Sequence, residues 1–312
     1  MFWDAKKTEN LNKIWRNYCI SDAYEPGSTF KPMTVAACLD EGVTTGSRAY
    51  HCDGYQVING VRIKCVAYSR GGHGTINICQ SLMESCNDVL MQLGADLGKR
   101  KFLQYVNEFG FGKKTGIDLP GEATGGVFTN DTMHAVELAT SSFGQGQTVT
   151  MIQMAAAFSS VINGGNYYEP HVVKEVKSEN GAVLESNDNA LVRRVITENT
   201  SKKLRKYLYK TVEEGTALPA KVAGYQIGGK TGTAEKHPTG RGNYLVSFIG
   251  FATKDNPEVM IYVTIDEPHV ADQAHSTYAT QFSSEVLKEV LPVLGMYQDS
   301  STKKADKTKA SD

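Results

Sequence analysis

The sequence contains no long hydrophobic run and no excess of charge of either sign. Its 312 residues include no stretch that approaches the roughly 18 consecutive apolar residues of a membrane-spanning helix. The opening residues, from Met1 to Lys7, lack the apolar segment of a secretory signal peptide. Lysine and arginine number 33 and aspartate and glutamate 34, so the formal net charge is -1. Because this balance gives no general electrostatic attraction to nucleic acid, we expect no nucleic-acid partner.

Cysteine is scarce, and beyond residue 86 it is absent. All six cysteines lie in the first third of the chain: Cys19, Cys38, Cys52, Cys65, Cys79 and Cys86. This distribution excludes a disulfide framework that extends over the whole chain. The sequence also has no internal repeat, and its 40% hydrophobic and 21% charged residues are ordinary for a globular protein.

The apolar pattern predicts helices in the first part of the chain and a sheet in the last part. Helices are expected at residues 28–42, within 75–93, and at 102–110, 151–162, 197–214 and 281–294. Strands are expected at residues 171–176, 182–184, 227–233, 244–251 and 259–265. Helices followed by an antiparallel sheet and a closing helix form an α+β fold. We place residues 1–295 in one domain and expect the charged tail, residues 296–312, to be disordered.

Ser28 and Lys31 form the first candidate site. Pro26 and Gly27 end the preceding segment, and the serine then stands at the expected start of a helix. Because positions three apart share one face of a helix, the Lys31 ammonium can lie over the Ser28 hydroxyl. A lysine in that place can make a serine nucleophilic without a histidine. Taken alone, this short pattern is more typical of a capped helix with a solvated lysine.

Ser85 and Asn87 form the second candidate site, between apolar residues of expected helices. A serine and an amide two residues apart can both face a cleft if they lie at a bend between helices. Taken alone, the pattern favours a plain N-cap for a helix that begins at Asp88.

The third candidate is the tetrapeptide Lys230-Thr231-Gly232-Thr233, which lies in a strand-like run. Gly232 allows the backbone of a ligand to approach closely. An exposed strand edge at this place can bind an extended peptide by strand addition. Taken alone, the run is more typical of an ordinary edge strand that a lysine protects from aggregation.

Together the three motifs resemble a known family. Ser-x-x-Lys, Ser-x-Asn and Lys-Thr-Gly, in that order, are the motif set of penicillin-binding proteins and serine β-lactamases. Residues 21–32, 143–153 and 229–252 are similar to characteristic segments of class B penicillin-binding proteins, the peptidoglycan D,D-transpeptidases. The resemblance runs from about residue 10 to residue 295 and is strongest to the sporulation-type enzymes of clostridium-like bacteria.

The resemblance implies a penicillin-binding-protein fold and a role for each residue of the first two motifs. Ser28 would attack the carbonyl between the two D-alanines of a peptidoglycan stem peptide and form an acyl-enzyme. Lys31 would accept the hydroxyl proton if burial and a neighbouring cation keep it neutral. Ser85 would relay a proton to the departing D-alanine, and Asn87 would hold the substrate amide and Lys31.

The third motif has an implied role in binding. Lys230 would supply positive potential toward the terminal carboxylate of the stem, and the hydroxyls of Thr231 and Thr233 would bind that group beside Gly232. The backbone N–H groups of Ser28 and Thr233 would form the oxyanion hole. The resemblance implies no cofactor for catalysis, and as partners peptidoglycan stems, β-lactam antibiotics and division or sporulation proteins. It also implies that the full-length protein is located on the extracytoplasmic face of the cell membrane.

A cysteine- and histidine-containing segment is not explained by the general family. Cys52, Asp53, Cys65 and His73 lie within about 25 residues of each other and could bind a structural zinc ion. A Cys52–Cys65 disulfide is the main alternative, since the family functions outside the cytoplasm, where disulfides persist. Two free thiols are the third possibility.

The sequence departs from the family before the active serine. Family members normally carry a membrane helix, a pedestal domain and two strands ahead of the serine helix. Residues 1–27 contain no alternating apolar run. We therefore expect an N-terminally truncated transpeptidase domain without a membrane anchor, whose sheet retains its three C-terminal strands.

Three other functions remain open at this stage. A D,D-carboxypeptidase or a β-lactamase would use water as the acceptor, but the sequence has no acidic loop clearly placed to activate water. A non-catalytic penicillin-binding sensor or scaffold, or an inactive fragment, is the alternative from a different class, because supporting strands are expected to be missing.

Overall fold

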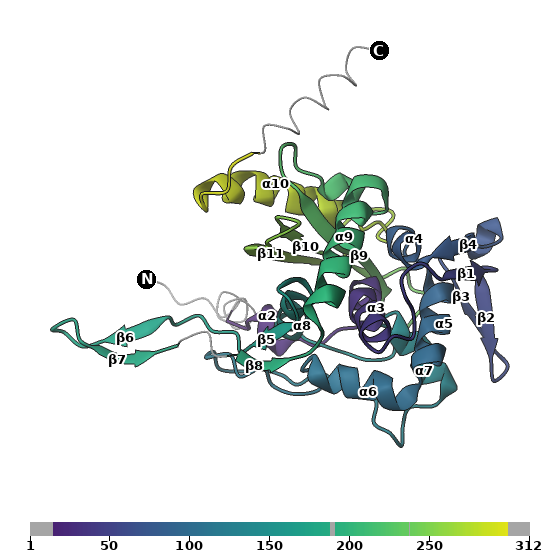
Figure 1. Ribbon diagram of the computed structural model, residues 1–312, viewed down its shortest axis with the longest axis horizontal. Helices are drawn as coiled ribbons and strands as arrows, with labels where there is room; N and C mark the ends of the chain where they lie inside the picture. The colour runs from purple at the N-terminus through teal and green to yellow at the C-terminus, as the bar shows by residue number, and fades with distance from the viewer. Residues whose placement is uncertain (1–14, 188–190, 237, 299–312) are drawn as a thin grey trace, which may run out of the picture.

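The structure, a computed structural model, describes residues 15–187, 191–236 and 238–298 (Figure 1). A helical region and an antiparallel sheet pack together, as expected for an α+β fold. Residues 299–312 lie outside the described ranges, so the disorder of the tail stays a prediction. No helix within the described ranges has the combined length and hydrophobicity needed to cross a membrane.

Several of the helices begin at a residue whose side chain caps the first turn. They are α2 (Tyr18–Ser21), α3 (Lys31–Asp40), α4 (Ile78–Met83), α5 (Asn87–Leu97), α6 (Lys99–Glu108), α7 (Ala135–Ser142), α8 (Met151–Ile162), α9 (Glu198–Glu214) and α10 (Thr277–Val293). At the start of α8, the Thr150 hydroxyl accepts the N–H of Gln153, and the Gln153 side chain accepts the N–H of Thr150. This reciprocal capping satisfies two N–H groups that the helix leaves unpaired.

The three C-terminal strands form the main sheet, as the sequence predicts. They are β9 (Ile227–Glu235), β10 (Tyr244–Ala252) and β11 (Val259–Asp266), all antiparallel, in the order β11-β10-β9. In Figure 1 the sheet lies between α10 on one side and α8 and α3 on the other. Coverage of both faces explains why every residue of β10 after Tyr244 is buried.

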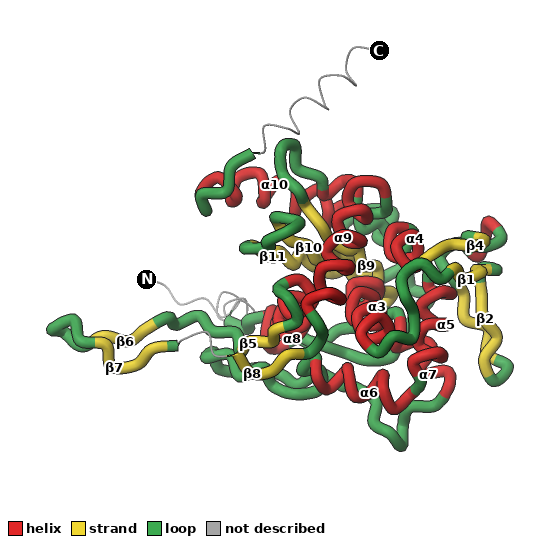
Figure 2. Tube along the Cα trace, in the orientation of Figure 1, coloured by secondary structure: helices red, strands yellow, loops and turns green. Residues whose placement is uncertain are grey.

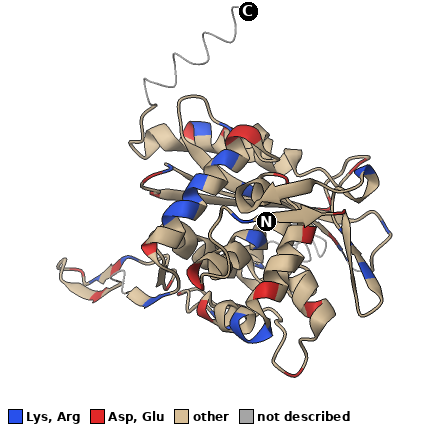
Figure 3. Ribbon diagram, turned by 45° about the vertical axis from the view of Figure 1, so that its right-hand side comes forward, with Lys and Arg blue, Asp and Glu red and all other residues tan. Residues whose placement is uncertain are grey.

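Helix α9 supports the edge of this sheet. Leu204, Leu208 and Val212 recur at four-residue spacing, are fully buried, and lie on the helix that packs against β9. Figure 3 shows lysine and arginine concentrated along this helix. The amphipathic pattern therefore fixes which side of α9 faces β9 and which side faces water.

Four short strand pairs complete the fold, and three of them were not predicted. Strand β1 (Ala49–Cys52) pairs with β4 (Gly74–Asn77), β2 (Tyr55–Ile58) with β3 (Val61–Lys64), β5 (Asn166–Tyr168) with β8 (Leu191–Arg194), and β6 (Glu175–Lys177) with β7 (Val183–Ser186). The fourth pair, β6–β7, corresponds to the strands predicted at residues 171–176 and 182–184, and helices α2 and α7 were not predicted. The β6–β7 pair projects from the body of the molecule (Figure 2). Strands of three or four residues carry too little periodic pattern to be recognised in a sequence.

Two predicted boundaries were wrong for identifiable reasons. The strand predicted from residue 171 begins only at Glu175, because the N–H groups of Val172 and Val173 donate to the Asp118 carboxylate instead of a neighbouring strand, both at 2.8 Å. The helical segment predicted within residues 75–93 begins with β4 and then breaks between α4 and α5 at residues 84–86. That break contains the second motif.

Phe248 fills the space that glycines leave on two strands of the sheet. Its side chain is fully buried on β10. A Cβ atom at Gly229 would lie 2.4 Å from this ring, and one at Gly250 would lie 2.5 Å from it. The ring therefore packs on the backbone of β9 and β10, directly behind the third motif.

We expect Phe248→Ala to lower the free energy of unfolding by about 3–5 kcal/mol, because it leaves a cavity between the strands. Phe282→Ala on α10 is the matched control, since the Phe282 side chain is 53% exposed. Its effect should stay below about 1 kcal/mol. Urea denaturation of both variants measures the difference. Equal losses of stability would contradict this account of the core.

Candidate active site

Ser28 lies in a short 3₁₀ helix, Gly27–Phe30, that leads directly into α3. Gly27 holds it in place: its φ is +54°, and its N–H donates to the carbonyl of Gly144 at 2.9 Å. Gly144 has a φ of +91°, and a Cβ there would lie 2.0 Å from the Gly27 carbonyl oxygen. Only glycine combines this backbone conformation with so close an approach. The 143–146 turn, which the resemblance marks as characteristic, thus positions the serine.

A chain of hydrogen bonds links Ser28 to Lys31 through Ser85. The Ser85 hydroxyl donates to Ser28 Oγ at 3.0 Å, and Lys31 Nζ donates to Ser85 Oγ at 3.0 Å. Lys31 Nζ also donates to the Ser85 carbonyl at 2.6 Å and to Asn87 Oδ1 at 2.7 Å. Among the described residues, no direct hydrogen bond joins Lys31 to Ser28. The structure therefore brings the first two motifs together, with Ser85 between the serine and the lysine.

The break between α4 and α5 places Ser85 and Asn87 where both can hydrogen-bond to Lys31. Ser85 has a φ of +54°, which is uncommon for a residue other than glycine and holds its carbonyl and its hydroxyl toward one ammonium group. Asn87 is the first residue of α5. Cys86 lies between them, and its sulfur accepts the N–H of Val89 at 3.5 Å.

The third motif lies on β9, with its glycine at a tight contact. Gly232 is opposite Ser247 of β10, and a Cβ at Gly232 would lie 2.3 Å from the Ser247 hydroxyl. Lys230 Nζ donates to the Thr231 carbonyl at 3.2 Å and to Thr231 Oγ1 at 3.3 Å. The lysine head thus turns back toward Thr231, although strand alternation alone sends the two side chains to opposite faces.

One cavity of about 360 Å³ contains members of all three motifs. Its lining includes Gly27, Ser28, Ser85, Asn87, Thr231 and Thr233. Phe143 and Gln145, from the segment 143–153 that the resemblance marks, also line it. The remaining lining residues were not candidate site residues in the sequence analysis: Val66, Glu84, Thr216, Glu235, Tyr244 and Ser276. Of these, Glu235 could have been found from β9 alone, because it continues the alternating row of Thr231 and Thr233.

Burial changes the pKa of both lysines. Removal from water lowers the pKa of Lys31 to about 8, although nearby thiols oppose the shift. Burial, and then the positive charge of Lys31, lowers the pKa of Lys230 well below its ordinary value. Both side chains are completely inaccessible to solvent. A buried lysine with a lowered pKa is a better proton acceptor near neutral pH than an exposed one.

Two tyrosines that the sequence analysis did not identify, Tyr24 and Tyr262, support the turn at residues 26–30 that carries Ser28. The hydroxyls of Tyr24 and Tyr262 are 2.5 Å apart, and the Tyr262 hydroxyl is 3.4 Å from Thr29 Oγ1. Thr29 in turn donates to the carbonyl of Pro26 at 2.7 Å. This partly buried network ties the turn before α3 to β11, and no sequence pattern connects residues so far apart in the chain.

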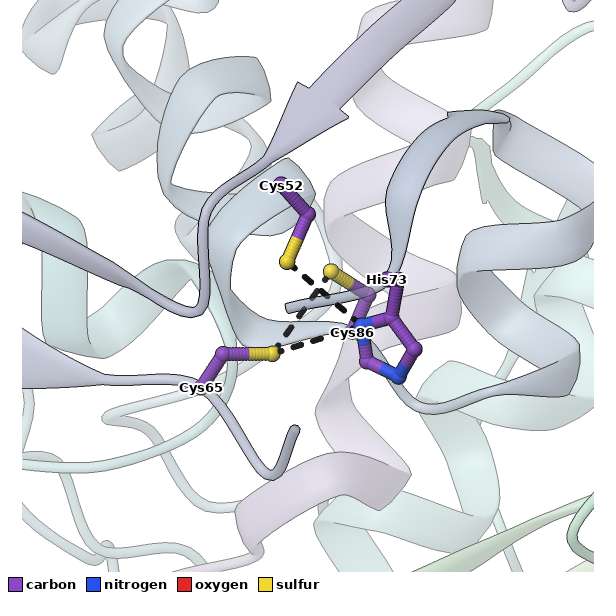
Figure 4. Close-up of side chains that lie close together, drawn as sticks. All are labelled: Cys52, Cys65, His73 and Cys86. Carbon is purple, nitrogen blue, oxygen red and sulfur yellow. Dashed lines mark hydrogen bonds between the residues drawn. The ribbon is translucent and has the colours of Figure 1, made fainter. Parts of the chain in front are cut away.

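Three of the four predicted metal ligands lie together, joined by a cysteine that was not predicted (Figure 4). The side chains of Cys52, Cys65, His73 and Cys86 bring one ligand atom each to within 4.8 Å of all the others. The Nδ1 atom of His73 is 3.5 Å from Cys52 Sγ and 3.6 Å from Cys65 Sγ, and the sulfurs of Cys65 and Cys86 are 3.7 Å apart. The Cys86 hydrogen bond lowers the pKa of Cys65 to about 4.

Asp53, the fourth predicted ligand, lies elsewhere. Its carboxylate is 3.1 Å from His51 Nε2, and its side chain is 72% exposed. It follows Cys52 at the end of β1, where successive side chains point in opposite directions, so the cysteine faces inward and the aspartate faces water. The fourth member of the cluster is therefore Cys86, and not Asp53 as the sequence had predicted. No disulfide joins any of the six cysteines, so the Cys52–Cys65 disulfide, the main alternative to a zinc site, is not formed.

Ser28 is hydrogen-bonded to Lys31 through Ser85, and β9, which carries Lys230, lines the same cavity with its threonines. This arrangement on an α+β fold is typical of a serine acyltransferase. The chain belongs to the penicillin-binding protein transpeptidase domain family, whose model matches residues 3–290. The family and the fold expected from the motifs are thereby confirmed.

Relatives place the chain within this family. It is 42% identical over 286 residues to Stage V sporulation protein D of Bacillus subtilis, covering 90% of this chain and 44% of that protein. It is 29% identical to a probable peptidoglycan D,D-transpeptidase PenA of Neisseria flavescens, over 90% of this chain and 67% of that one. A solved structure of penicillin-binding protein 3 from Mycobacterium tuberculosis, complexed with ampicillin, superposes with a TM-score of 0.83 at 26% identity, covering 91% of this chain and 65% of that one. The chain thus spans less than half of the first of these relatives.

Proposed function

We propose that this domain is a peptidoglycan D,D-transpeptidase, which cross-links stem peptides through an acyl-enzyme on Ser28. The observation that carries the proposal is the hydrogen-bonded chain Ser28–Ser85–Lys31, in which the lysine is buried and has a lowered pKa. The names of relatives support the reaction class, since one is named a peptidoglycan D,D-transpeptidase and another a probable one. The ampicillin complex of a structural neighbour supports β-lactams as ligands.

In the first step Ser28 Oγ attacks the carbonyl carbon between the two D-alanines. Its proton passes through the Ser85 hydroxyl to neutral Lys31, along hydroxyl groups whose hydrogens rotate freely. The C–N bond then breaks, and the departing D-alanine nitrogen takes this proton back through Ser85. The products are an ester on Ser28 and free D-alanine.

The β9 strand supplies the binding side of the reaction. Thr231 and Thr233 line the cavity and offer hydroxyls to the terminal carboxylate, with the side-chain nitrogen of Lys230 beside Thr231. The N–H groups of Ser28 and Thr233 face the negative charge that develops on the carbonyl oxygen. Fixed donors of this kind usually supply the largest part of catalysis in acyl transfer. Asn87 holds Lys31 and remains near the cavity for the substrate amide.

In the second step an amine of a neighbouring stem attacks the ester carbonyl. The amine loses a proton to the Lys31–Ser85 pair, and Ser28 leaves with that proton, so the catalyst is regenerated and the new bond is an amide. Water in place of the amine would make the protein a D,D-carboxypeptidase. A β-lactam acylates Ser28 in the same way as the stem peptide does.

We also propose that the complete protein acts in the spore cell wall, on the extracytoplasmic side of the membrane. Identity of 42% to a stage V sporulation protein supports this assignment. Its partners would then be the proteins that synthesise the spore cortex, with vegetative division proteins as the alternative.

We infer that the cluster of Cys52, Cys65, His73 and Cys86 is a structural zinc site. Zinc bonds of about 2.3 Å to sulfur and about 2.0–2.1 Å to nitrogen imply edges of roughly 3.5–3.8 Å in a tetrahedron. Three of the six separations in the cluster, at 3.5, 3.6 and 3.7 Å, match these edges. Three thiols and one imidazole are a common donor set for structural zinc. A bound ion would fix Cys86, and with it the turn that holds Ser85 and Asn87, but catalysis itself needs no metal.

We expect mass spectrometry with labelled benzylpenicillin to find one adduct, on Ser28 of the folded protein. Ser28→Ala should reduce the labelling rate by at least about a thousandfold, because the nucleophile is gone. Ser47→Ala, in an exposed loop, is the matched control and should label normally. An unlabelled wild-type protein that is folded would refute the assignment.

A cross-linking assay with a lipid-linked peptidoglycan precursor separates the remaining functions. The transpeptidase proposal predicts penicillin labelling together with dimeric stem peptides in the product. Labelling with release of D-alanine but no dimers would indicate a carboxypeptidase. Labelling without any turnover would indicate a sensor or scaffold.

The rate of acylation by benzylpenicillin should increase with pH and level off above about 8. Lys31 accepts a proton only when neutral, and burial sets its pKa at about 8, so the active fraction grows as pH rises toward that value. Lys31→Arg keeps its charge at every accessible pH and should abolish acylation. Stopped-flow rates between pH 6 and 9 provide the measurement. A flat profile for the wild type would rule out Lys31 as the base.

Metal analysis of protein purified without chelators should find roughly one zinc per chain. Cys52→Ser and Cys86→Ser should each lower this content, because a thiolate ligand is lost. Asp53→Asn is the matched control and should retain the metal, since Asp53 lies outside the cluster. Loss of zinc in Asp53→Asn with retention in Cys86→Ser would favour the ligand set predicted from sequence. Absence of zinc from all four proteins would refute the site.

A further inference from the structure

The row of side chains that β9 presents to the cavity ends on a carboxylate. Thr231, Thr233 and Glu235 all line the cavity, because alternate residues of a strand share one face. The two threonines belong to the motif, but Glu235 has no part in the reaction proposed above. Its side chain is partly buried rather than free in solvent.

The charge of Glu235 is not neutralised by a neighbour. Within the described residues, no lysine or arginine forms an ion pair with it. Its carboxylate accepts the N–H of Gly240 at 2.5 Å, which fixes its position. The next residue, Lys236, points to the opposite face, where its ammonium lies 2.8 Å from Asp266 and 2.6 Å from Glu267. Among the described residues, Glu235 therefore lines the cavity as a carboxylate that is held in place and has no ion-pair partner.

The position of this anion along the substrate follows from the proposed function, on which this inference rests. Strand β9 is at the edge of the described sheet, so an extended peptide can lie along it. With the terminal carboxylate at Thr231 and the scissile carbonyl at the N–H of Thr233, the peptide runs toward Glu235 in its N-terminal direction. Two residues of a strand span roughly 6.6 Å. Glu235 then lies beside the residue that precedes the two D-alanines.

We propose that Glu235 selects stem peptides whose residue before D-Ala-D-Ala carries a positively charged side chain. The substrate class is thus a stem with a diamino acid at that position, with its distal amine free and protonated in the donor strand. The carboxylate pairs with this ammonium and holds the donor in register over Ser28. Glu235 is a specificity-determining residue, not a catalytic one, because it lies beyond the reacting carbonyl.

Two peptides that differ by one charge test the pairing. Nα-acetyl-L-lysyl-D-alanyl-D-alanine keeps its side-chain ammonium, and the Nα,Nε-diacetyl form lacks it. Each peptide competes with labelled benzylpenicillin for the site, and NMR titration of the same peptides measures binding independently of acylation. We expect the wild type to bind the charged peptide about five- to tenfold more tightly, as a partly screened ion pair allows.

Substitutions show whether Glu235 is the cause. Glu235→Gln should reduce the preference to about one, since the amide keeps its shape and the Gly240 contact but loses the charge. Glu185→Gln makes the same change in net charge on exposed strand β7 and should retain the wild-type preference. Glu235→Lys should reverse the order of the two peptides. Glu185→Gln should leave the rate of penicillin labelling within about twofold of the wild type, and labelling of Ser28 in the Glu235 variants shows that their site is folded.

The results separate this inference from the function on which it rests. Equal binding of the two peptides by the wild type, or a preference that persists in Glu235→Gln, overturns the role of Glu235 while penicillin labelling continues. Failure of penicillin to label Ser28 refutes the proposed function instead. The NMR titration still decides the peptide preference in that case.

Discussion

The buried ammonium of Lys31 is the interaction on which the site depends. It donates to Ser85 Oγ, to the Ser85 carbonyl and to Asn87 Oδ1, so one side chain of α3 holds the turn between α4 and α5. A buried lysine is costly unless its donors are satisfied. Because these three acceptors come from a single turn, the turn must keep the unusual positive φ of Ser85. The same burial lowers the pKa of Lys31 and suits it to accept a proton.

Each wall of the cavity is held by a different kind of contact. The serine turn rests on Gly27 and Gly144, whose backbones approach too closely for any other residue. Strand β9 rests on Phe248, which occupies the space above two glycines of the sheet. The α4–α5 turn adjoins the cluster that contains Cys86, so a structural metal there would brace the side of the cavity opposite β9. Rigid support on three sides keeps a nucleophile, a base and a binding strand in register.

The long elements could be predicted because their patterns are local. Residues 151–162 have both an apolar pattern and a capping box, and the predicted helix has the observed bounds. The three C-terminal strands were found from their apolar runs, while short strand β1, which carries Cys52, and short strand β4, which follows His73, were not. Cys86 was overlooked as a ligand because its sequence neighbours are catalytic candidates. Its sulfur meets those of Cys52 and Cys65 only after β1, β4 and the α4–α5 turn have packed.

The sequence by itself determined the family, the order of the three motifs and the chemical types present at the site. Those properties depend on residue identity and on spacing within short segments, which a sequence records directly. Only the tertiary structure decided that Ser85 lies between Ser28 and Lys31, that Asp53 faces water, and that Glu235 shares a wall with Thr233. These relations join segments far apart in the chain or depend on which face of a short strand is buried. They become fixed only when the helices and the sheet pack against each other.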